Sequence, residues 1–213
     1  MSQGSFATLR QAPPRYLALG DSYTIGEGVD ADGRWPMQLV AALRRDGIAI
    51  ADPRIVATTG WTTDELAAGI DAAAPQGPFD LVTLLIGVNN QYRGRPLDEY
   101  RAQFDALLQR AIGFADGRAR RVLVVSIPDW GVTAFAQPPA HDPVRIGTQI
   151  DAFNAAAQAC CQARAVRFVD ITTASRDGGG SAAMLAADGL HPSAAMYARW
   201  TEQVLPAARD ALA

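Results

Sequence analysis

The chain has 213 residues, of which 49% are hydrophobic and 19% are charged, and its formal net charge is −3 at pH 7. A chain of this length can bury one sizeable core, and its slightly negative charge argues against nucleic acid as a partner and against a basic membrane-binding face. All 19 basic residues are Arg. Because Lys is absent, a Schiff-base lysine, a Ser–Lys dyad and a P-loop lysine are excluded.

No Gly/Ser/Pro-rich linker divides the sequence, so we expect a single domain over residues 1–213, with 1–14 as a loosely ordered N-terminal arm. The arm lacks the apolar core of a signal peptide, and no long uninterrupted apolar run occurs elsewhere. We therefore expect no membrane span and a cytoplasmic location. Cys160 and Cys161 are neighbours in one predicted helix, where they should stay unbridged, and no metal or other cofactor is expected.

The first predicted element is a buried strand over 16–20, which ends in Gly20-Asp21-Ser22. Gly20 permits a tight backbone because it has no Cβ. Ser22 then lies outside the carboxyl end of the strand, where open α/β sheets bind their ligands. A capping serine is the structural alternative, since Asp and Ser are both preferred N-cap residues.

Strands and helices then alternate along the chain. Further strands are predicted at 54–57, 79–86, 121–127 and 166–171, and helices at 35–46, 62–73, 96–115, 146–160 and from Pro192 to about 212. Thr62 and Glu65 have the spacing of a capping box. The run 79–86 is almost continuously apolar, which suits a central parallel strand. The segments 129–142 and 176–181 are expected to be irregular.

This alternation implies a parallel sheet with helices on both faces and right-handed crossovers. Five strands are too few for an eight-stranded barrel. The predicted fold is therefore an α/β protein, a three-layer α/β/α sandwich around a five-stranded parallel sheet.

Polar residues and glycines follow the strands at points that a parallel sheet brings to one edge. Ser22 follows the first strand, Gly60 the second and Asn89 the third, and Asp188-Gly189-Leu190-His191 lies beyond the fifth. A serine hydroxyl needs a base within hydrogen-bond reach to act as a nucleophile. His191 can be that base, with Asp188 three residues earlier to hold its Nδ1–H.

The same edge offers donors for a developing oxyanion, namely the backbone N–H groups of Ser22 and Gly60 and the Asn89 amide. Each residue also has a plain structural interpretation. Gly60 can be a turn glycine, Asn89 can stabilise a loop, Asp188 can be a surface carboxylate, and His191 can be an N-terminal helix residue before Pro192. The second histidine, His141, is interpreted as a solvated loop residue rather than a second base.

These blocks, Gly20-Asp21-Ser22, Gly60, Gly87-Val88-Asn89 and Asp188-Gly189-Leu190-His191, resemble the four blocks of the SGNH (GDSL) hydrolase family in order and in placement. The resemblance implies a flavodoxin-like sandwich and an esterase, lipase or acyl-thioester hydrolase. It assigns Ser22 as nucleophile, His191 as base and Asp188 as its orienting partner, with Ser22, Gly60 and Asn89 as the oxyanion hole. One position departs from the family pattern, since Asn90 stands where the family usually has Asp.

The substrate is expected to be a small or medium carboxylic ester, cleaved through an acyl-enzyme on Ser22. A carbohydrate deacetylase or an acyl-thioesterase on the same site is the alternative, and a catalytically inactive binding module is the alternative from another class. The segments 92–95 and 130–141 should border the pocket. The side chains expected to contact substrate are Trp130, Asn90 and Tyr92, while Arg93 and Arg95 either meet an anionic group or are solvated.

Overall fold

The structure is a computed structural model that describes residues 12–213, so most of the N-terminal arm expected over 1–14 lies outside the described residues. One sheet contains five parallel strands in the order β2-β1-β3-β4-β5. The strands are β1 (Tyr16–Gly20), β2 (Arg54–Ala57), β3 (Leu81–Leu85), β4 (Val122–Val125) and β5 (Arg167–Val169). This strand order is that of flavodoxin-like proteins.

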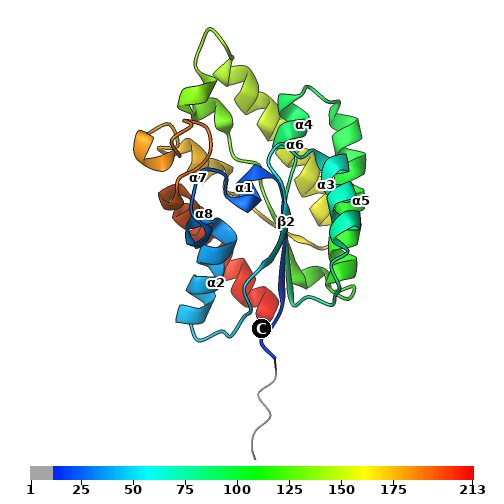
Figure 1. Cartoon of the computed structure of the whole chain (residues 1–213). Helices are drawn as coiled ribbons and strands as arrows, with labels where there is room; N and C mark the ends of the chain where they lie inside the picture. The colour runs from blue at the N-terminus through cyan, green and yellow to red at the C-terminus, as the bar shows by residue number, and fades with distance from the viewer. Residues whose placement is uncertain (1–11) are drawn as a thin grey trace, which may run out of the picture.

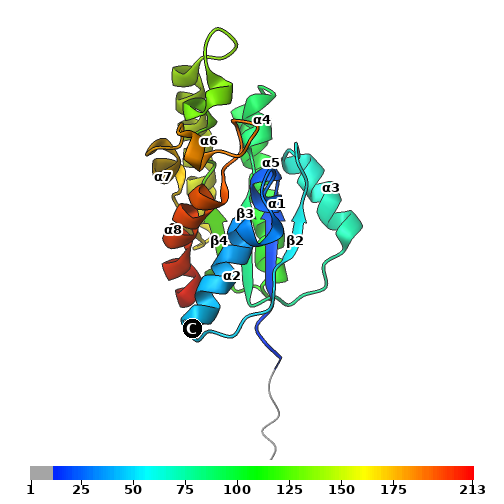
Figure 2. The ribbon, with the colours of Figure 1, turned by 60° about the vertical axis from the view of Figure 1, so that its left-hand side comes forward.

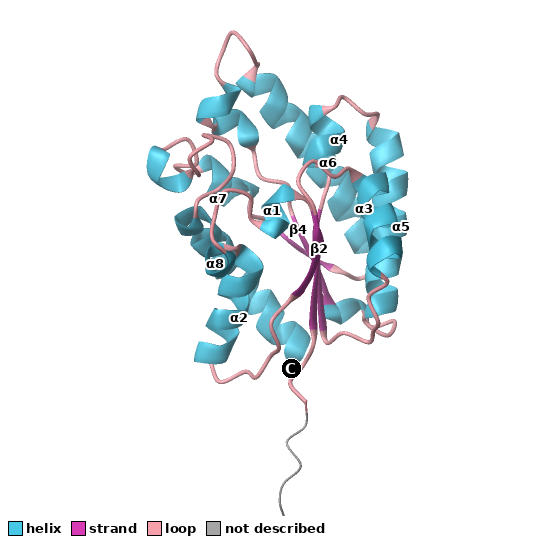
Figure 3. Cartoon of the chain, viewed as in Figure 1, coloured by secondary structure: helices cyan, strands magenta, loops and turns pink. Residues whose placement is uncertain are grey.

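Helices cover both faces of the sheet, as Figures 1 and 3 show. The helices are α1 (Ser22–Ile25), α2 (Trp35–Arg45), α3 (Thr63–Ala73), α4 (Val88–Tyr92), α5 (Leu97–Phe114), α6 (Pro143–Ala163), α7 (Thr172–Arg176) and α8 (Ala194–Leu212). On one face α2 packs against α8, and on the other α5 packs against α3 and α6. The predicted three-layer α/β/α sandwich is therefore confirmed, and Figure 2 shows the layers from a second direction.

The core is built on the central strands β1 and β3, in which every residue is buried. A strand covered by helices on both faces buries successive side chains on opposite sides, and this is why both sequences are apolar without alternation. Two of the polar groups that these strands bury are paired with each other, because the Tyr16 hydroxyl and Thr83 Oγ1 lie 2.9 Å apart.

The strands are shorter than the apolar runs that predict them, because side chains and loops bind the flanking backbone. Phe79 N donates to Phe114 O at 2.8 Å, so the run 79–86 joins the sheet only from Leu81. After β4, the Asn154 amide receives a hydrogen bond from Ile127 N at 2.8 Å and donates one to Ile127 O at 3.0 Å. The run 121–127 therefore leaves the sheet at Val125.

Glycine is required where β1 and β3 leave the sheet. A Cβ at Gly20 would collide with Thr24 and with the Leu85 carbonyl of the neighbouring strand. Gly87 has a φ of +131°, and a Cβ there would lie 2.5 Å from the Tyr100 ring. These two glycines bring the turns that follow β1 and β3 against each other at the carboxyl edge of the sheet.

The cysteines, the character of the helices and the segment 129–142 also agree with the sequence-based expectations. Cys160 and Cys161 are free and buried, as expected for neighbours on a helix. Among residues 12–213, no helix combines the length and the apolar character that crossing a bilayer requires. The segment 129–142 is irregular as predicted, but it contains two short 3-10 helices, η3 (Trp130–Val132) and η4 (Ala134–Ala136).

Substitution of Gly87 tests the packing of the strand exits. Gly87→Ala should lower the free energy of unfolding by roughly 2 to 5 kcal/mol, because it adds backbone strain at positive φ to an overpacked contact with Tyr100. Gly113→Ala is the matched control, since Gly113 lies in α5 and a Cβ there meets nothing within 4 Å. It should raise the stability by about 0.5 to 1 kcal/mol. Urea unfolding curves measure both, and equal stabilities of the two variants would contradict the packing argument.

Candidate active site

Ser22 is the first residue of α1 and lies directly beyond the carboxyl end of β1, with 4% of its surface exposed. The residue that caps this helix is Asp21, whose Oδ1 accepts a hydrogen bond from Tyr23 N at 3.0 Å. The Ser22 hydroxyl is therefore not used as the cap, which was the structural alternative for this serine.

Asp188 and His191 form one compact turn. Asp188 Oδ1 accepts hydrogen bonds from Leu190 N at 2.9 Å and from His191 N at 3.0 Å, while Oδ2 lies 2.6 Å from His191 Nδ1. The Asp188 carboxylate thus holds both the backbone of the turn and the imidazole ring of His191. The Tyr23 ring packs edge-on to this imidazole at 5.8 Å, so the base is held on two sides.

The carboxyl group of Asp188 is ionised at neutral pH. Partial burial opposes ionisation, but the hydrogen bonds from the His191 ring and from the two backbone N–H groups outweigh it and hold the pKa of Asp188 below its usual range. An ionised carboxylate at Nδ1 accepts the Nδ1–H of the neutral imidazole and leaves Nε2 with a free lone pair. The turn is therefore arranged to supply a base at Nε2.

Gly60 and Asn89 line the same cavity as Ser22, and each is anchored by a further contact. Asn89 Nδ2 donates one hydrogen to Trp61 O at 2.9 Å, which leaves its second amide hydrogen available. Arg93 Nη2 donates to Gly60 O at 2.7 Å and Nη1 to Glu65 at 3.2 Å. Arg93 therefore supports the Gly60 loop.

Arg95 also has a structural partner, since its Nη1 lies 2.7 Å from Asp64. Neither Arg93 nor Arg95 is among the residues that line the cavity beside Ser22. Both side chains form ion pairs at the start of α3 while remaining partly exposed to solvent.

A cavity of about 200 Å³ brings the predicted residues together. Its wall contains Ser22, Tyr23, Thr59, Gly60, Val88, Asn89, Tyr92, Trp130, Phe135, Leu190 and His191. Asp188 lies behind His191, and no hydrogen bond joins the Ser22 hydroxyl to His191 in this structure. Hydrogen bonds between a nucleophile and its base are often long in the absence of substrate. Ser22 and His191 are related here because both line the same cavity.

Asn90, which was expected to contact substrate, does not line this cavity. It is fully buried, and its Oδ1 accepts from Thr63 N at 3.1 Å while its Nδ2 donates to Thr63 Oγ1 at 2.8 Å. The Thr63 hydroxyl then donates to Gln103. Asn90 thus holds the first turn of α3 in place, and the amide suits this position because Thr63 presents both a donor and an acceptor to it.

Trp130 and Tyr92 do line the cavity, together with Phe135, which the sequence analysis did not single out as a contact residue. His141 was interpreted as a solvated loop residue, but its half-buried ring packs against these three aromatic side chains at centroid distances of 5.1 to 6.4 Å. Only the position of Phe135 inside the segment 130–141 could have indicated its role, since an isolated phenylalanine in a loop carries no pattern.

Asp21 is an unusual neighbour for a nucleophile because its side chain is fully buried. Its Oδ2 has no hydrogen-bond partner within residues 12–213. Loss of solvation raises the pKa of Asp21 to about 7, against the opposing effect of the hydrogen bond from Tyr23 N. Near neutral pH this carboxyl group therefore holds its proton in a substantial fraction of the molecules.

Comparisons with known proteins identify the family and the fold. A family model described as the GDSL-like Lipase/Acylhydrolase family matches residues 18–199. No curated protein matches the chain. Among solved structures, TesA is similar with 23% identity over 93% of this chain and 99% of that chain, with a TM-score of 0.72.

Two other solved structures are similar at lower identity. Axe2, an acetylxylan esterase from Geobacillus stearothermophilus, has 20% identity over 92% of this chain and 94% of that chain, with a TM-score of 0.67. The psychrotrophic esterase EstA from Pseudoalteromonas sp. has 16% identity over 93% and 94% of the two chains, with a TM-score of 0.65. Likeness at these identities shows a shared fold.

Asp21→Asn tests the protonation of the buried carboxyl group. In the unfolded chain this group ionises near its ordinary pKa of 3.8, whereas in the folded protein it keeps its proton up to about pH 7. Stability should therefore fall between about pH 4 and pH 7 by up to about 1.4 kcal/mol per pH unit, and this loss should be absent in the neutral variant. Asn also keeps the acceptor for Tyr23 N.

The measurement is the free energy of unfolding of both proteins at a series of pH values. The difference between the two curves isolates Asp21 from the other titrating groups. Parallel curves would show that Asp21 is ionised in the folded protein at an ordinary pKa.

Proposed function

The chain belongs to the GDSL-like lipase/acylhydrolase family, and on that premise we propose that it is a serine hydrolase that cleaves carboxylic esters through an acyl-enzyme on Ser22. The observation that carries the proposal is the single cavity whose wall contains Ser22, Gly60, Asn89 and His191. The 2.6 Å contact between Asp188 and His191 Nδ1 supports it, because it leaves Nε2 as the free nitrogen.

In the first step, Ser22 Oγ attacks the carbonyl carbon of the ester and its proton passes to His191 Nε2. The carbonyl oxygen becomes an oxyanion, which the backbone N–H groups of Ser22 and Gly60 and the second amide hydrogen of Asn89 can bind. The bond to the alcohol oxygen then breaks, and Nε2 returns its proton to that oxygen. The products of this step are a free alcohol and an ester on Ser22.

In the second step, water attacks the acyl-enzyme and gives a proton to His191 Nε2. The second tetrahedral intermediate uses the same donors, and its collapse returns the proton to Ser22 Oγ and releases the carboxylic acid. Asp188 stabilises the imidazolium that forms in both steps without taking up the proton itself. Its depressed pKa supports this role, because a carboxylate that ionises easily stays charged beside the imidazolium.

The cavity supports a small or medium acyl ester as substrate. Its volume of about 200 Å³ lies below the range of about 300 to 1,000 Å³ that is common for sites of drug-sized ligands. Axe2 is an acetylxylan esterase by its description, so a sugar acetate is the second candidate. An inactive binding module is disfavoured because no member of the proposed catalytic set is missing.

Labelling with a fluorophosphonate tests the proposal directly. The reagent should add once, at Ser22, and abolish hydrolysis of a chromogenic acetate or butyrate ester, because it forms a stable adduct with an activated serine. Ser22→Ala should prevent both labelling and hydrolysis. Ser181→Ala is the matched control, since Ser181 is exposed in a loop and should leave both unchanged.

Peptide mapping by mass spectrometry locates the adduct. An adduct on another serine, or hydrolysis that survives in Ser22→Ala, would reject Ser22 as the nucleophile. Ser126 is an informative site in the same map, because it is buried and its hydroxyl already contacts Thr172 Oγ1 at 2.8 Å.

Asn89→Ala tests the oxyanion hole. Loss of one donor that acts only on the tetrahedral intermediate should lower kcat by roughly 10²- to 10³-fold with little change in KM. The variant also loses the hydrogen bond to Trp61 O, which should cost about 1 kcal/mol of stability and can be measured separately by urea unfolding. A raised KM at unchanged kcat would instead assign Asn89 to substrate binding.

A further inference from the structure

Three aromatic side chains from three separate elements meet at the mouth of the cavity. Tyr92 lies at the end of α4, Trp130 begins η3 and Phe135 lies in η4. The Tyr92 and Trp130 rings are 5.5 Å apart at 68°, and the Trp130 and Phe135 rings are 6.2 Å apart at 55°. We call these three residues the aromatic rim.

Much of the rim faces solvent, although its side chains are large and apolar. Tyr92 is 53% exposed and Phe135 is 40% exposed, while Trp130 is 4% exposed and closes the rim between them. Exposed apolar groups that gather at the mouth of a concave site are typical of a ligand-binding surface.

We infer that Phe135 and Trp130 bind the alcohol part of the ester, and that this part carries an aromatic ring. The inference rests on the proposed function, since it assigns the two sides of the substrate around Ser22. It makes Phe135 the specificity-determining residue for the leaving group.

The position of Phe135 follows from its backbone. Phe135 N donates to Gly189 O at 3.0 Å, which ties the residue to the turn that carries His191. The alcohol oxygen must lie next to His191 Nε2 to receive a proton, so a substituent on that oxygen extends toward this turn. Phe135 is the residue of the aromatic rim that the turn holds there.

Tyr92 lies at the other end of the rim. It follows Asn89 by three residues in α4, so the two side chains are on the same face of this short helix. The rim therefore runs from the oxyanion donor to the base, with Trp130 in the middle. A ring on the alcohol meets Phe135 and Trp130, whereas the acyl part lies nearer to Tyr92.

The rim offers mainly ring faces and edges, and its exposed hydroxyl, that of Tyr92, lies at the acyl end. Trp130 Nε1 already donates to Gln91 Oε1 at 2.8 Å, and the nearby Thr59 hydroxyl donates to Glu27. A sugar needs partners for its hydroxyl groups, and neither of these two groups is free to donate to it. Another aromatic ring can instead pack edge-to-face or offset against Phe135 and Trp130, which is a favourable arrangement for aromatic pairs.

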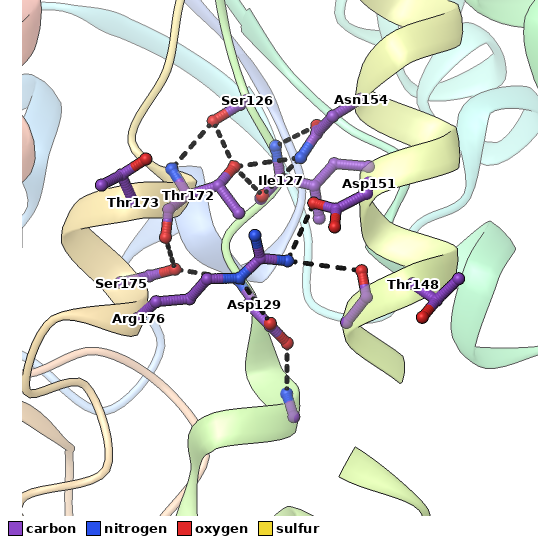
Figure 4. Close-up of polar contacts among 12 residues, drawn as sticks. Ser126, Ile127, Asp129, Thr148, Asp151, Asn154, Thr172, Thr173, Ser175 and Arg176 are labelled. Carbon is purple, nitrogen blue, oxygen red and sulfur yellow. Dashed lines mark hydrogen bonds and ion pairs between the residues drawn. The ribbon is translucent and has the colours of Figure 1, made fainter. Parts of the chain in front are cut away.

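The backbone that carries Trp130 is held in place by hydrogen bonds and an ion pair. Asp129, which precedes Trp130, accepts from Arg176 Nε at 2.8 Å and from Gly131 N at 2.9 Å, and its own N–H donates to Ser175 at 2.9 Å (Figure 4). Figure 4 also shows Arg176 reaching Asp151 of α6, so α6 and α7 clamp the start of η3. A pre-organised rim loses little conformational entropy on binding.

The test compares benzyl acetate with cyclohexylmethyl acetate. The two alcohols have similar size and similar acidity, and both esters give the same acetyl-enzyme, so they differ mainly in the aromaticity of the leaving group. Wild-type kcat/KM should favour the benzyl ester by roughly two- to tenfold. Phe135→Leu keeps an apolar side chain and should reduce this ratio toward one, while the rate of acetyl-enzyme hydrolysis stays unchanged.

Two further variants test whether the preference for the benzyl ester depends on Phe135 in particular. Val144→Ala removes an apolar side chain that is 79% exposed and does not line the cavity, and it should leave the ratio and both rates unchanged. Tyr92→Leu should change kcat/KM of both esters alike, because Tyr92 lies on the acyl side. Phe135 is partly exposed, so Phe135→Leu is expected to fold, and urea unfolding checks this.

The outcomes separate the inference from the proposed function. If wild type hydrolyses both esters with equal kcat/KM, or if Phe135→Leu lowers both values by the same factor, the inference is overturned while the hydrolase proposal stands. If the fluorophosphonate fails to label Ser22 and neither ester is hydrolysed, the proposed function itself fails.

Discussion

The close approach of β1 and β3 at their carboxyl ends is the constraint on which the rest of the site depends. Gly20 pairs with Leu85 across the two strands, and the chain leaves both strands through positions that admit no Cβ. Because the turns are so tight, Ser22 and Asn89 come within reach of one small cavity without any long loop. Rigid strands rather than flexible segments therefore set the distance between the proposed nucleophile and its oxyanion donor.

The site combines two halves that are stabilised independently. One half belongs to the sheet exits and the start of α3, where Arg93 and Asn90 hold the backbone around Gly60 and Thr63. The other half is the Asp188 turn, which carries the base and is tied by Gly189 to the aromatic rim. The aromatic rim lies between the two halves, so the residues that line the substrate pocket also connect the oxyanion donors with the base.

Much of this arrangement could be predicted from the sequence. Glycine marks the exits of β1, β2 and β3, and apolar spacing marks the helices, so the sheet, its layers and the edge that carries Ser22, Asn89 and His191 follow from local patterns. Asn90 and His141 could not be placed in this way, because their roles depend on contacts with other elements that no local pattern indicates. Asn90 is bound by Thr63, and His141 packs on rings that three other elements supply. Residues in a very short helix or in a loop have no periodicity that would reveal what they contact.

The combination of buried phenols and a chain without lysine has a consequence for behaviour in alkali. Four of the five tyrosines are buried, and loss of solvation raises their phenol pKa, as burial does for the thiol pKa of both cysteines. The folded protein therefore changes its net charge little near pH 10, where lysines and phenols usually titrate. The unfolded chain ionises these groups at ordinary values, so unfolding in alkali releases several protons together. The folded state is then expected to persist to about pH 9 and to collapse over a narrow interval above it.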